Sequence, residues 1–173
     1  MPHNILSGEQ ELDVLVFKVC KREFAIPVSS FCGTIPHYIF ADRYRDENYF
    51  IEGVLNIRGW LIPVINFRRK FRISIKKDYS CLSSKILIFE VNDINLAVVI
   101  DDMPELMSLS ADNLICSSKD RKIHAIKKLN NRIIKIINPE SLISLKEEHI
   151  IRDIGKIRNY NNYLYMMPES VIA

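Results

Sequence analysis

The side chains that could carry catalysis or bind a metal are spread along this 173-residue chain without forming a motif. Its four histidines are His3, His37, His124 and His149, and its four cysteines are Cys20, Cys32, Cys81 and Cys116. Their spacing matches neither a zinc site nor a redox dithiol. The five glycines form no phosphate-binding loop. The sequence therefore predicts no catalytic residue, no metal and no cofactor, and it indicates free thiols in a reducing compartment.

A short acidic cluster comes closest to catalytic chemistry. Asp101, Asp102 and Glu105 follow an apolar run and could form an acid–base pair or a site for a hard cation. A polar turn, in which the first aspartate accepts backbone hydrogen bonds at the end of a strand, explains the same residues. We favour the turn, because aspartate commonly takes this role.

A basic run offers a second chemistry, the binding of phosphates. Its members are Arg68, Arg69, Lys70, Arg72, Lys76 and Lys77, and a second basic set surrounds residues 119–128. Proteins that bind nucleic acid interleave such residues with exposed aromatic side chains. Phe67 and Phe71 frame the run, but their spacing suits the buried side of one helical turn. We favour a solvated surface, with a small barrel that binds nucleic acid through residues 68–77 as the alternative.

One arginine stands in an unusual setting. The stretch GVLNIRGWLIPVINFRRKF, residues 53–71, places Arg58 and Gly59 between two apolar, strand-like runs. The strand period of two puts Ile51, Leu55 and Ile57 on one face with Gly53. Gly59 permits a tight bend before the second strand begins. Arg58 is therefore predicted to lie exposed at the end of a hairpin, held in place by two strands.

The chain positions these residues on many short strands. Between residues 12 and 138 we find the runs LDVLVFKV, EFAIPVS, YFIEGVLNI, WLIPVIN, KILIFEV, INLAVVID, HAIKKL and RIIKII. Short strands at close spacing predict a barrel or a sandwich. Two-residue turns are predicted at Lys21–Arg22, Asn92–Asp93 and Asn130–Asn131. The polar stretch 74–85 is predicted to connect two lobes.

The C-terminal part is predicted to be helical. Asn138, Pro139 and Glu140 are typical of a helix start. Ile150, Ile151, Ile154 and Ile157 have the spacing of an amphipathic helix, and a loosely ordered tail is expected to follow.

The N-terminal residues, the apolar runs and the net charge bear on whether the protein is secreted, spans a membrane or binds nucleic acid. The N-terminal residues do not have the pattern of a signal peptide, and no window approaches the ~20 apolar residues that a membrane-spanning helix needs. The net charge of +3 is too balanced to indicate nucleic acid by itself. We expect a cytoplasmic protein without direct membrane insertion.

Four segments in order resemble the CheW family of chemotaxis coupling proteins. They are VFKVCKREFAIPVSSF, GVLNIRGWLIPVINFRRKF, ILIFEVNDINLAVVIDDMPELMSL and LNNRIIKIINPESLI. The match covers roughly residues 12–145, and the most specific piece is the Gly-Val-x-Asn-x-Arg-Gly block at residues 53–59. One such block would be weak, but four in register indicate a whole domain of this family.

The resemblance implies an all-β (mainly β) fold. Two five-stranded SH3-like barrels would pack side by side, with short helices that include a C-terminal one. A single domain would cover residues 12–145, with barrels at roughly 12–75 and 84–138 and terminal segments able to cross over. Residues 146–173 would form a helical extension and tail.

The resemblance also implies a non-catalytic scaffold or adaptor of chemotaxis signal transduction. Such a protein couples the cytoplasmic tip of a methyl-accepting chemoreceptor to the regulatory domain of the histidine kinase CheA. The complex would lie in a membrane-associated receptor array, which can include other coupling proteins. Neither nucleic acid nor the bilayer itself would be a partner.

Binding residues follow by resemblance. The implied receptor-binding residues are Val28, Phe31, Thr34, Gly53, Asn56 and Arg58. The implied kinase-binding residues are Leu96, Val98, Val99 and Met103, although alternate members of this run must be core. An arginine at a hairpin end can hydrogen-bond and stack on a partner helix. It can equally cap a carbonyl or carboxylate of its own chain, and the two roles are compatible.

The sequence departs from the family pattern at several positions. Gly33 stands where the family usually has a glutamate, Asn66 where it has an aspartate, Ala97 where it has a glycine, and Asn48 where it has a proline. These departures indicate a divergent member.

Overall fold

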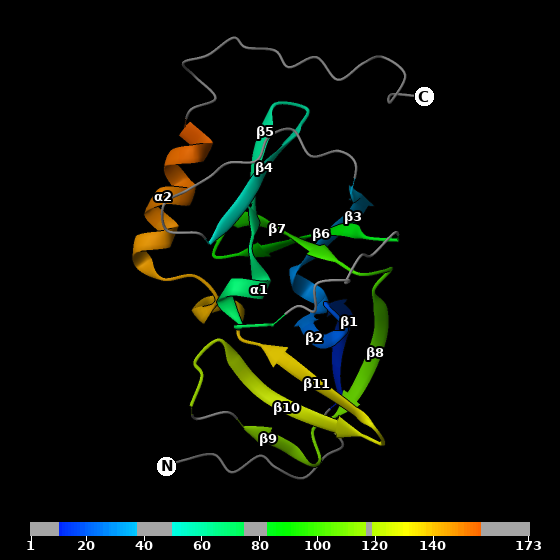
Figure 1. The fold of residues 1–173 in the computed structure, drawn as a ribbon. Helices are drawn as coiled ribbons and strands as arrows, with labels where there is room; N and C mark the ends of the chain where they lie inside the picture. The colour runs from blue at the N-terminus through cyan, green and yellow to red at the C-terminus, as the bar shows by residue number, and fades with distance from the viewer. Residues whose placement is uncertain (1–10, 38–49, 75–82, 117–118, 157–173) are drawn as a thin grey trace.

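The computed structural model describes residues 11–37, 50–74, 83–116 and 119–156, which form two β-sheets (Figure 1). The first sheet has the order β8 (Glu105–Ser110), β1 (Glu11–Val19), β2 (Arg22–Pro27), β11 (Arg132–Ile137), β10 (Ile123–Leu129) and β9 (Leu114–Cys116). The second has the order β3 (Phe31–Pro36), β6 (Lys85–Val91), β7 (Ile94–Ile100), β5 (Trp60–Ile65) and β4 (Ile51–Ile57). We call them the first and second barrel. The predicted mainly β fold is confirmed.

The two barrels are not consecutive halves of the chain. The N-terminal β1–β2 hairpin joins β8 to β11, and β2 runs parallel to β11 through the pair Ala25 and Ile136. β3 to β5 join β6 and β7 instead, with Val64 beside Ala97. The expected bounds of 12–75 and 84–138 therefore do not each enclose one barrel, because segments cross over between the sheets, as the resemblance allowed for terminal segments. The first barrel also has six strands rather than five, because the short β9 adds to β10.

Tight turns of positive φ connect the strands. The predicted turns at Asn92–Asp93 and Asn130–Asn131 are confirmed, and φ is 49° at Asn92, 61° at Asp93 and 50° at Asn130. The turn predicted at Lys21–Arg22 lies one residue earlier, at Cys20 (φ 50°) and Lys21 (φ 64°), because Arg22 already pairs with Val19. Positive φ at both central residues, as at Cys20–Lys21 and Asn92–Asp93, is what a type I′ hairpin turn requires, whereas at Asn130–Asn131 only the first residue has positive φ.

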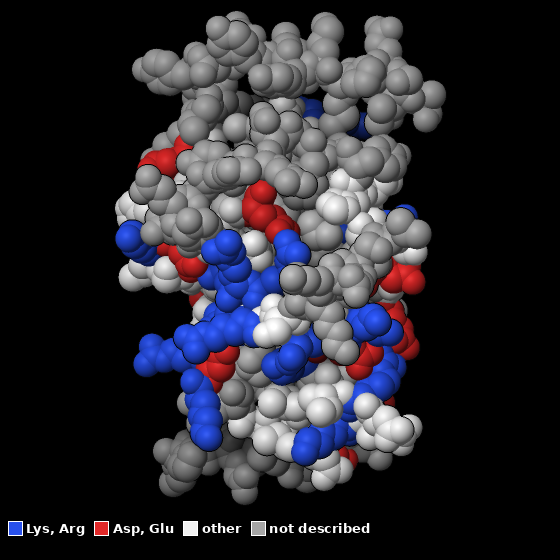
Figure 2. All heavy atoms as spheres, viewed as in Figure 1, with Lys and Arg blue, Asp and Glu red and all other residues white. Residues whose placement is uncertain are grey.

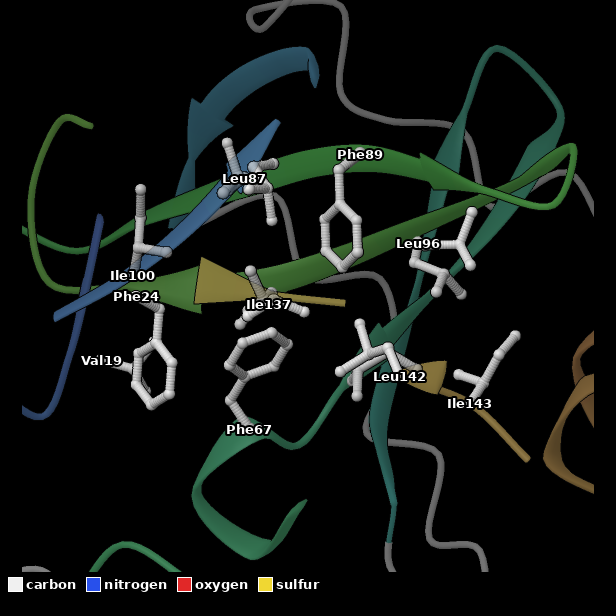
Figure 3. Close-up of a cluster of buried hydrophobic side chains, with 14 of the residues drawn as sticks. Val19, Phe24, Phe67, Leu87, Phe89, Leu96, Ile100, Ile137, Leu142 and Ile143 are labelled. Atoms are coloured by element: carbon white, nitrogen blue, oxygen red, sulfur yellow. The ribbon is translucent and has the colours of Figure 1, made fainter. Parts of the chain in front are cut away.

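Three apolar clusters hold the fold together. Val14 and Val16 of β1 face the interior of the first barrel, while Leu55 of β4 and Ile62 of β5 face that of the second. The largest cluster lies between the barrels and is called the junction core here; Figure 3 displays part of it. Its aromatic members are Phe17, Phe24, Phe50, Phe67 and Phe89. Strands that contribute to this core while enclosing their own barrel are buried on both faces.

Four short helices complete the described part of the chain, and two of them, α1 and α2, contribute to the junction core. They are η1 (Val28–Ser30), α1 (Phe67–Lys70), η3 (Pro139–Ser141) and α2 (Leu145–Lys156). The predicted helical turn at Phe67 is confirmed, and its ring lies 5.7 Å from that of Phe24. The helix predicted to start at Asn138 is only a 3-10 turn, and α2 begins at Leu145. Ile151 and Ile154 of α2 are buried in the junction core, so α2 is part of the domain body.

The start of α2 is fixed by a capping box that also reaches α1. The Glu147 carboxylate accepts the N–H of Ser144 at 2.7 Å, and the Ser144 hydroxyl accepts the N–H of Glu147 at 3.3 Å. The same carboxylate accepts Lys70 Nζ at 2.7 Å. Burial opposes ionisation of Glu147, but the hydrogen bonds from Lys70 and Ser144 outweigh it and lower the pKa of this carboxyl. Residues 157–173, where Ile157 and the predicted tail fall, lie outside the described part.

Candidate partner-binding site

The turn between β4 and β5 presents one arginine to solvent. Arg58 has a φ of 52° and Gly59 a φ of 83°, and Ile57 pairs with Trp60 across the turn. The side-chain oxygen of Asn56 accepts the N–H of Gly59 at 2.9 Å, which holds the turn in this shape. Arg58 is exposed, as predicted. Among the described residues it has no carboxylate partner, so the role of a cap within its own chain is not seen there.

The strand that leads to this turn carries a bulge. The pairing of β4 with β5 shifts between Ile51 and Gly53. Ile51 therefore faces the junction core together with Val54, while Leu55 faces the second barrel. The expected single face of Ile51, Gly53 and Leu55 is wrong at Ile51, because a bulge adds one residue to the period of two. Beyond the bulge the alternation holds and both faces of β4 are anchored.

The other residues implied for receptor binding lie in two groups. Val28, Phe31 and Thr34 belong to η1 and β3, where the chain passes from the first barrel to the second. Phe31 has 37% of its surface exposed, and Val28 and Thr34 are half-buried. The second group is on β4 and its turn, where Gly53 is buried and Asn56 is half-buried. Because Asn56 holds the turn, its side chain positions Arg58, and the buried Gly53 has no side chain to offer.

The residues implied for kinase binding do not form one surface. Leu96 and Val98 are fully buried in the junction core, so their assignment as surface residues is wrong. β7 lies between β6 and β5 and is covered on both faces, which explains its unbroken apolar run. Val99 is half-buried beside the second barrel's core, and Met103, in the β7–β8 connection, has 60% of its surface exposed. Only Met103 of the four is well exposed.

The acidic cluster forms a structural turn. Asp101 accepts the N–H of Cys20 at 2.9 Å and that of Lys21 at 2.6 Å, and its own N–H donates to the carbonyl of Lys18 at 2.8 Å. The strand-end aspartate that accepts backbone hydrogen bonds is therefore confirmed. These bonds tie the end of β7 in the second barrel to the β1–β2 turn of the first. The neighbouring Asp102 accepts only the N–H of Met103, at 2.8 Å, among the contacts of the described residues.

The basic run is interrupted by ion pairs in its described part. Arg68 lies 3.4 Å from Glu52, and Lys70 lies 2.7 Å from Glu147 with only 8% of its side chain exposed. The Phe71 ring packs against Phe24 and Phe67 rather than pointing to solvent. Figure 2 shows Lys and Arg side chains of this face lying among Asp and Glu side chains. Lys76 and Lys77 lie outside the described residues. These contacts favour the solvated surface over a surface for stacking bases.

Trp60 and Leu106 are among the exposed apolar side chains that were not predicted. Trp60, the first residue of β5, has 61% of its surface exposed, and Leu106 of β8 has 67%. The position of Trp60 directly after the Arg58–Gly59 turn could have been noticed in the sequence. Leu106 could not, because its exposure depends on β8 being an outer strand of the first barrel. Both extend the candidate surface beyond the residues implied by resemblance.

The described residues offer little for other chemistry. Within residues 11–37, 50–74, 83–116 and 119–156, no three His, Cys, Asp or Glu side chains gather to hold a metal ion. No helix in these ranges is long and apolar enough to cross a membrane.

Comparison with known proteins agrees with this architecture. The CheW-like domain family matches residues 13–147. The chemotaxis protein CheW of Bacillus subtilis (strain 168) is 26% identical over 149 residues, which cover 83% of this chain and 92% of that protein. The chemotaxis protein CheW of Helicobacter pylori is 24% identical over 141 residues, covering 79% and 84%. The crystal structure of the scaffolding protein TtCheW from Thermoanaerobacter tengcongensis superposes with a TM-score of 0.67 at 19% identity, covering 80% of this chain and 96% of that one.

The fold of the two barrels thus has its counterpart in the fold of a known scaffolding protein. The chain belongs to the CheW-like family, since the match spans most of its length. Its low identity to the curated relatives fits the predicted divergent member, and the prediction of a scaffold or adaptor of chemotaxis is confirmed at the level of the family.

Proposed function

We propose that this chain couples the cytoplasmic tip of a chemoreceptor to the regulatory domain of the histidine kinase CheA. It would act without catalysis in the cytoplasm, at membrane-associated receptor arrays that can include other coupling proteins. The observation that carries the proposal is the β4–β5 hairpin, which anchors both faces of β4 and leaves Arg58 exposed without a partner carboxylate among the described residues. A planar guanidinium held in this way suits a carboxylate on a partner helix.

A second, separate surface supports the role of a coupler. Met103 and Leu106 are exposed in the β7–β8 connection and on β8. In Figure 1 the β4–β5 turn lies at the top of the view and β8 at the lower right. A protein that links two partners needs two such surfaces. We assign the Arg58 surface to the receptor, and the surface of Met103, with the half-buried Val99, to the kinase.

The test is reconstitution with partners from the same organism. Receptor cytoplasmic fragments, CheA and this protein are sedimented together, and CheA autophosphorylation is measured as this protein is added. We expect activation that depends on the protein and is lost in Arg58→Glu, whose exposed position leaves the urea midpoint unchanged. Arg121→Glu, a charge reversal at an exposed arginine of the first barrel, is the matched control.

Each other result points elsewhere. Binding to CheA without activation would contradict an activating coupler and indicate an accessory one. If Arg58→Glu binds the receptor as the unaltered chain does, the role of Arg58 is wrong. Binding to an oligonucleotide that weakens steeply with salt, with no binding to receptor or kinase, would favour the nucleic-acid alternative.

A further inference from the structure

Trp60 is the single tryptophan of the chain and is largely exposed, with 61% of its surface open. It pairs with Ile57 directly beside the Arg58–Gly59 turn. Side chains two apart on a strand share a face, and Ile62 and Val64 of the same strand fill the second barrel. Trp60 therefore continues the row of barrel residues beyond the end of the barrel interior, where its indole reaches solvent.

The chemistry of this position suits recognition. Tryptophan and arginine are the residue types most enriched among those that dominate binding energy at protein interfaces. An indole offers a large rigid apolar area with few torsions to fix, and a guanidinium beside it adds a charge that selects the partner. Here both are held by one turn whose shape is fixed by the bond from Gly59 to Asn56. Little backbone ordering would therefore oppose binding, which favours affinity.

We propose that Trp60 and Arg58 together form the contact for one receptor helix, which gives a carboxylate to Arg58 and an aliphatic side chain to the face of the indole. This inference rests on the proposed function and adds to it the residue that supplies the apolar part of the contact. Charge complementarity selects an acidic helix, because within the described part of the chain Arg58 is exposed and has no ion-pair partner. The kinase is assigned to the separate surface of Met103.

The fluorescence of Trp60 gives a direct test, because no other tryptophan contributes to the emission of this chain. A receptor cytoplasmic fragment whose own tryptophans are replaced by phenylalanine is titrated into the full chain. We expect the emission to move to shorter wavelength and acrylamide quenching to fall as the helix covers the indole. A CheA regulatory domain prepared in the same way is expected to leave both signals unchanged.

Variants separate contact from fold. Trp60→Ala should weaken binding of the receptor fragment about tenfold or more, as truncation of a dominant interface residue does. Trp60→Phe should retain part of the affinity. The control is Ile133→Ala, at an exposed apolar side chain of β11 in the first barrel, which should bind normally. Urea unfolding of each variant verifies that it is folded before its binding is interpreted.

The outcomes distinguish the two proposals. If the fragment sediments with the chain but the emission does not change, or if Trp60→Ala binds as the unaltered chain does, this inference is overturned while the coupling function stands. A shift with the CheA domain and none with the receptor fragment overturns the receptor assignment. If the unaltered chain binds neither partner, the proposed function fails and this inference fails with it.

Discussion

The turns at Cys20–Lys21 and Arg58–Gly59 have the same backbone design and opposite surroundings. Each joins two antiparallel strands through two residues of positive φ, 50° and 64° in the first turn, 52° and 83° in the second. Only the second contains a glycine, the residue that adopts positive φ without steric cost. Three of the four positions are therefore held in a conformation that an ordinary side chain disfavours by about 1–2 kcal/mol.

The surroundings explain how each turn is used. The carboxylate of Asp101 covers the first turn and accepts both of its N–H groups. That turn faces the other barrel and joins the two. In the second turn the N–H of Gly59 donates to Asn56 of its own strand, and Arg58 and Gly59 are exposed. The same local design thus joins the two barrels at the first turn, where a carboxylate from the other barrel accepts its N–H groups. At the second turn, for which the described residues show no such carboxylate, we propose that it presents Arg58 to a partner.

Removing the Asp101 carboxylate, which accepts both N–H groups of the first turn, should have the largest effect on stability. Asp101→Ala leaves two N–H groups without their carboxylate and removes the bonds between the end of β7 and the β1–β2 turn. We expect the free energy of unfolding to fall by about 2 kcal/mol, less than the sum for two fully buried charged hydrogen bonds, because the site is half-buried. Urea unfolding followed by circular dichroism measures the change.

The adjacent aspartate is the matched control. Asp102 is exposed and accepts only the N–H of the next residue among the described contacts. Asp102→Ala should alter stability by less than about 0.5 kcal/mol. If the two variants are equally stable, Asp101 does not join the barrels as its hydrogen bonds indicate.

Removing the support of the second turn should affect stability less and binding more. Asn56→Ala removes the acceptor for the N–H of Gly59, but water can replace it at this exposed turn. We expect a loss of about 0.5–1 kcal/mol in the free energy of unfolding. Because the turn then samples other shapes, receptor binding should weaken severalfold although Arg58 is still present. Isothermal titration of the receptor fragment measures the second effect.

Asn56→Asp distinguishes positioning from contact. An aspartate retains an oxygen that can accept the N–H of Gly59, so a purely positioning role predicts near-normal stability. Its added charge beside Arg58 should still reduce affinity for an acidic helix. If Asn56→Ala binds the receptor normally, the turn keeps its shape without this bond and Asn56 has no positioning role.

The Arg58–Gly59 turn and the exposure of Arg58 could be predicted from the sequence, but the hydrogen bonds of Asp101 to the other barrel could not. The Arg58–Gly59 turn and the exposure of Arg58 follow from a strand period interrupted by glycine. Asp101 was recognised as a strand-end aspartate, but nothing local identifies Cys20 and Lys21, 80 or more residues away, as its partners. Those partners depend on the crossing of the β1–β2 hairpin into the sheet of β8 to β11. The resemblance allowed terminal segments to cross over, but the sequence does not say which segment completes which barrel.

Burial on two faces limited the prediction of surface residues. The run INLAVVI of β7 has no alternation, because one face fills the second barrel and the other the junction core. The resemblance implies Leu96 and Val98 as binding residues, and the strand period predicts that only alternate members of the run are core. In the structure every member of the run is buried except the exposed Asn95 and the half-buried Val99. When both faces of a strand are covered, its ends and the adjoining connections are the parts most accessible to a partner. For β7 the exposed residue of such a connection is Met103.

The two turns can also be compared at a single matched position. Lys21 and Gly59 are the second central residues of their turns, with φ of 64° and 83°. Lys21→Gly should raise the free energy of unfolding by about 0.5 kcal/mol. Glycine removes the energetic cost of positive φ in the folded state, and this gain exceeds the stabilisation of the unfolded chain by the greater conformational entropy of glycine. Gly59→Ala should lower it by about 1 kcal/mol for the opposite reason. Both changes are read from urea midpoints at constant m-value.

The sign of the Lys21 change is the informative part. The N–H of residue 21 still donates to Asp101 in Lys21→Gly, so the variant alters the strain of the turn and leaves its cover in place. A gain would mean that the first turn is strained and that the Asp101 bonds offset the strain. A lower free energy of unfolding would mean that the lysine side chain itself stabilises the contact between the barrels. The two turns would then differ in a side-chain contact as well as in the Asp101 hydrogen bonds. The double variant Lys21→Gly/Asp101→Ala decides between these: if strain relief is independent of the cover, the two single effects add.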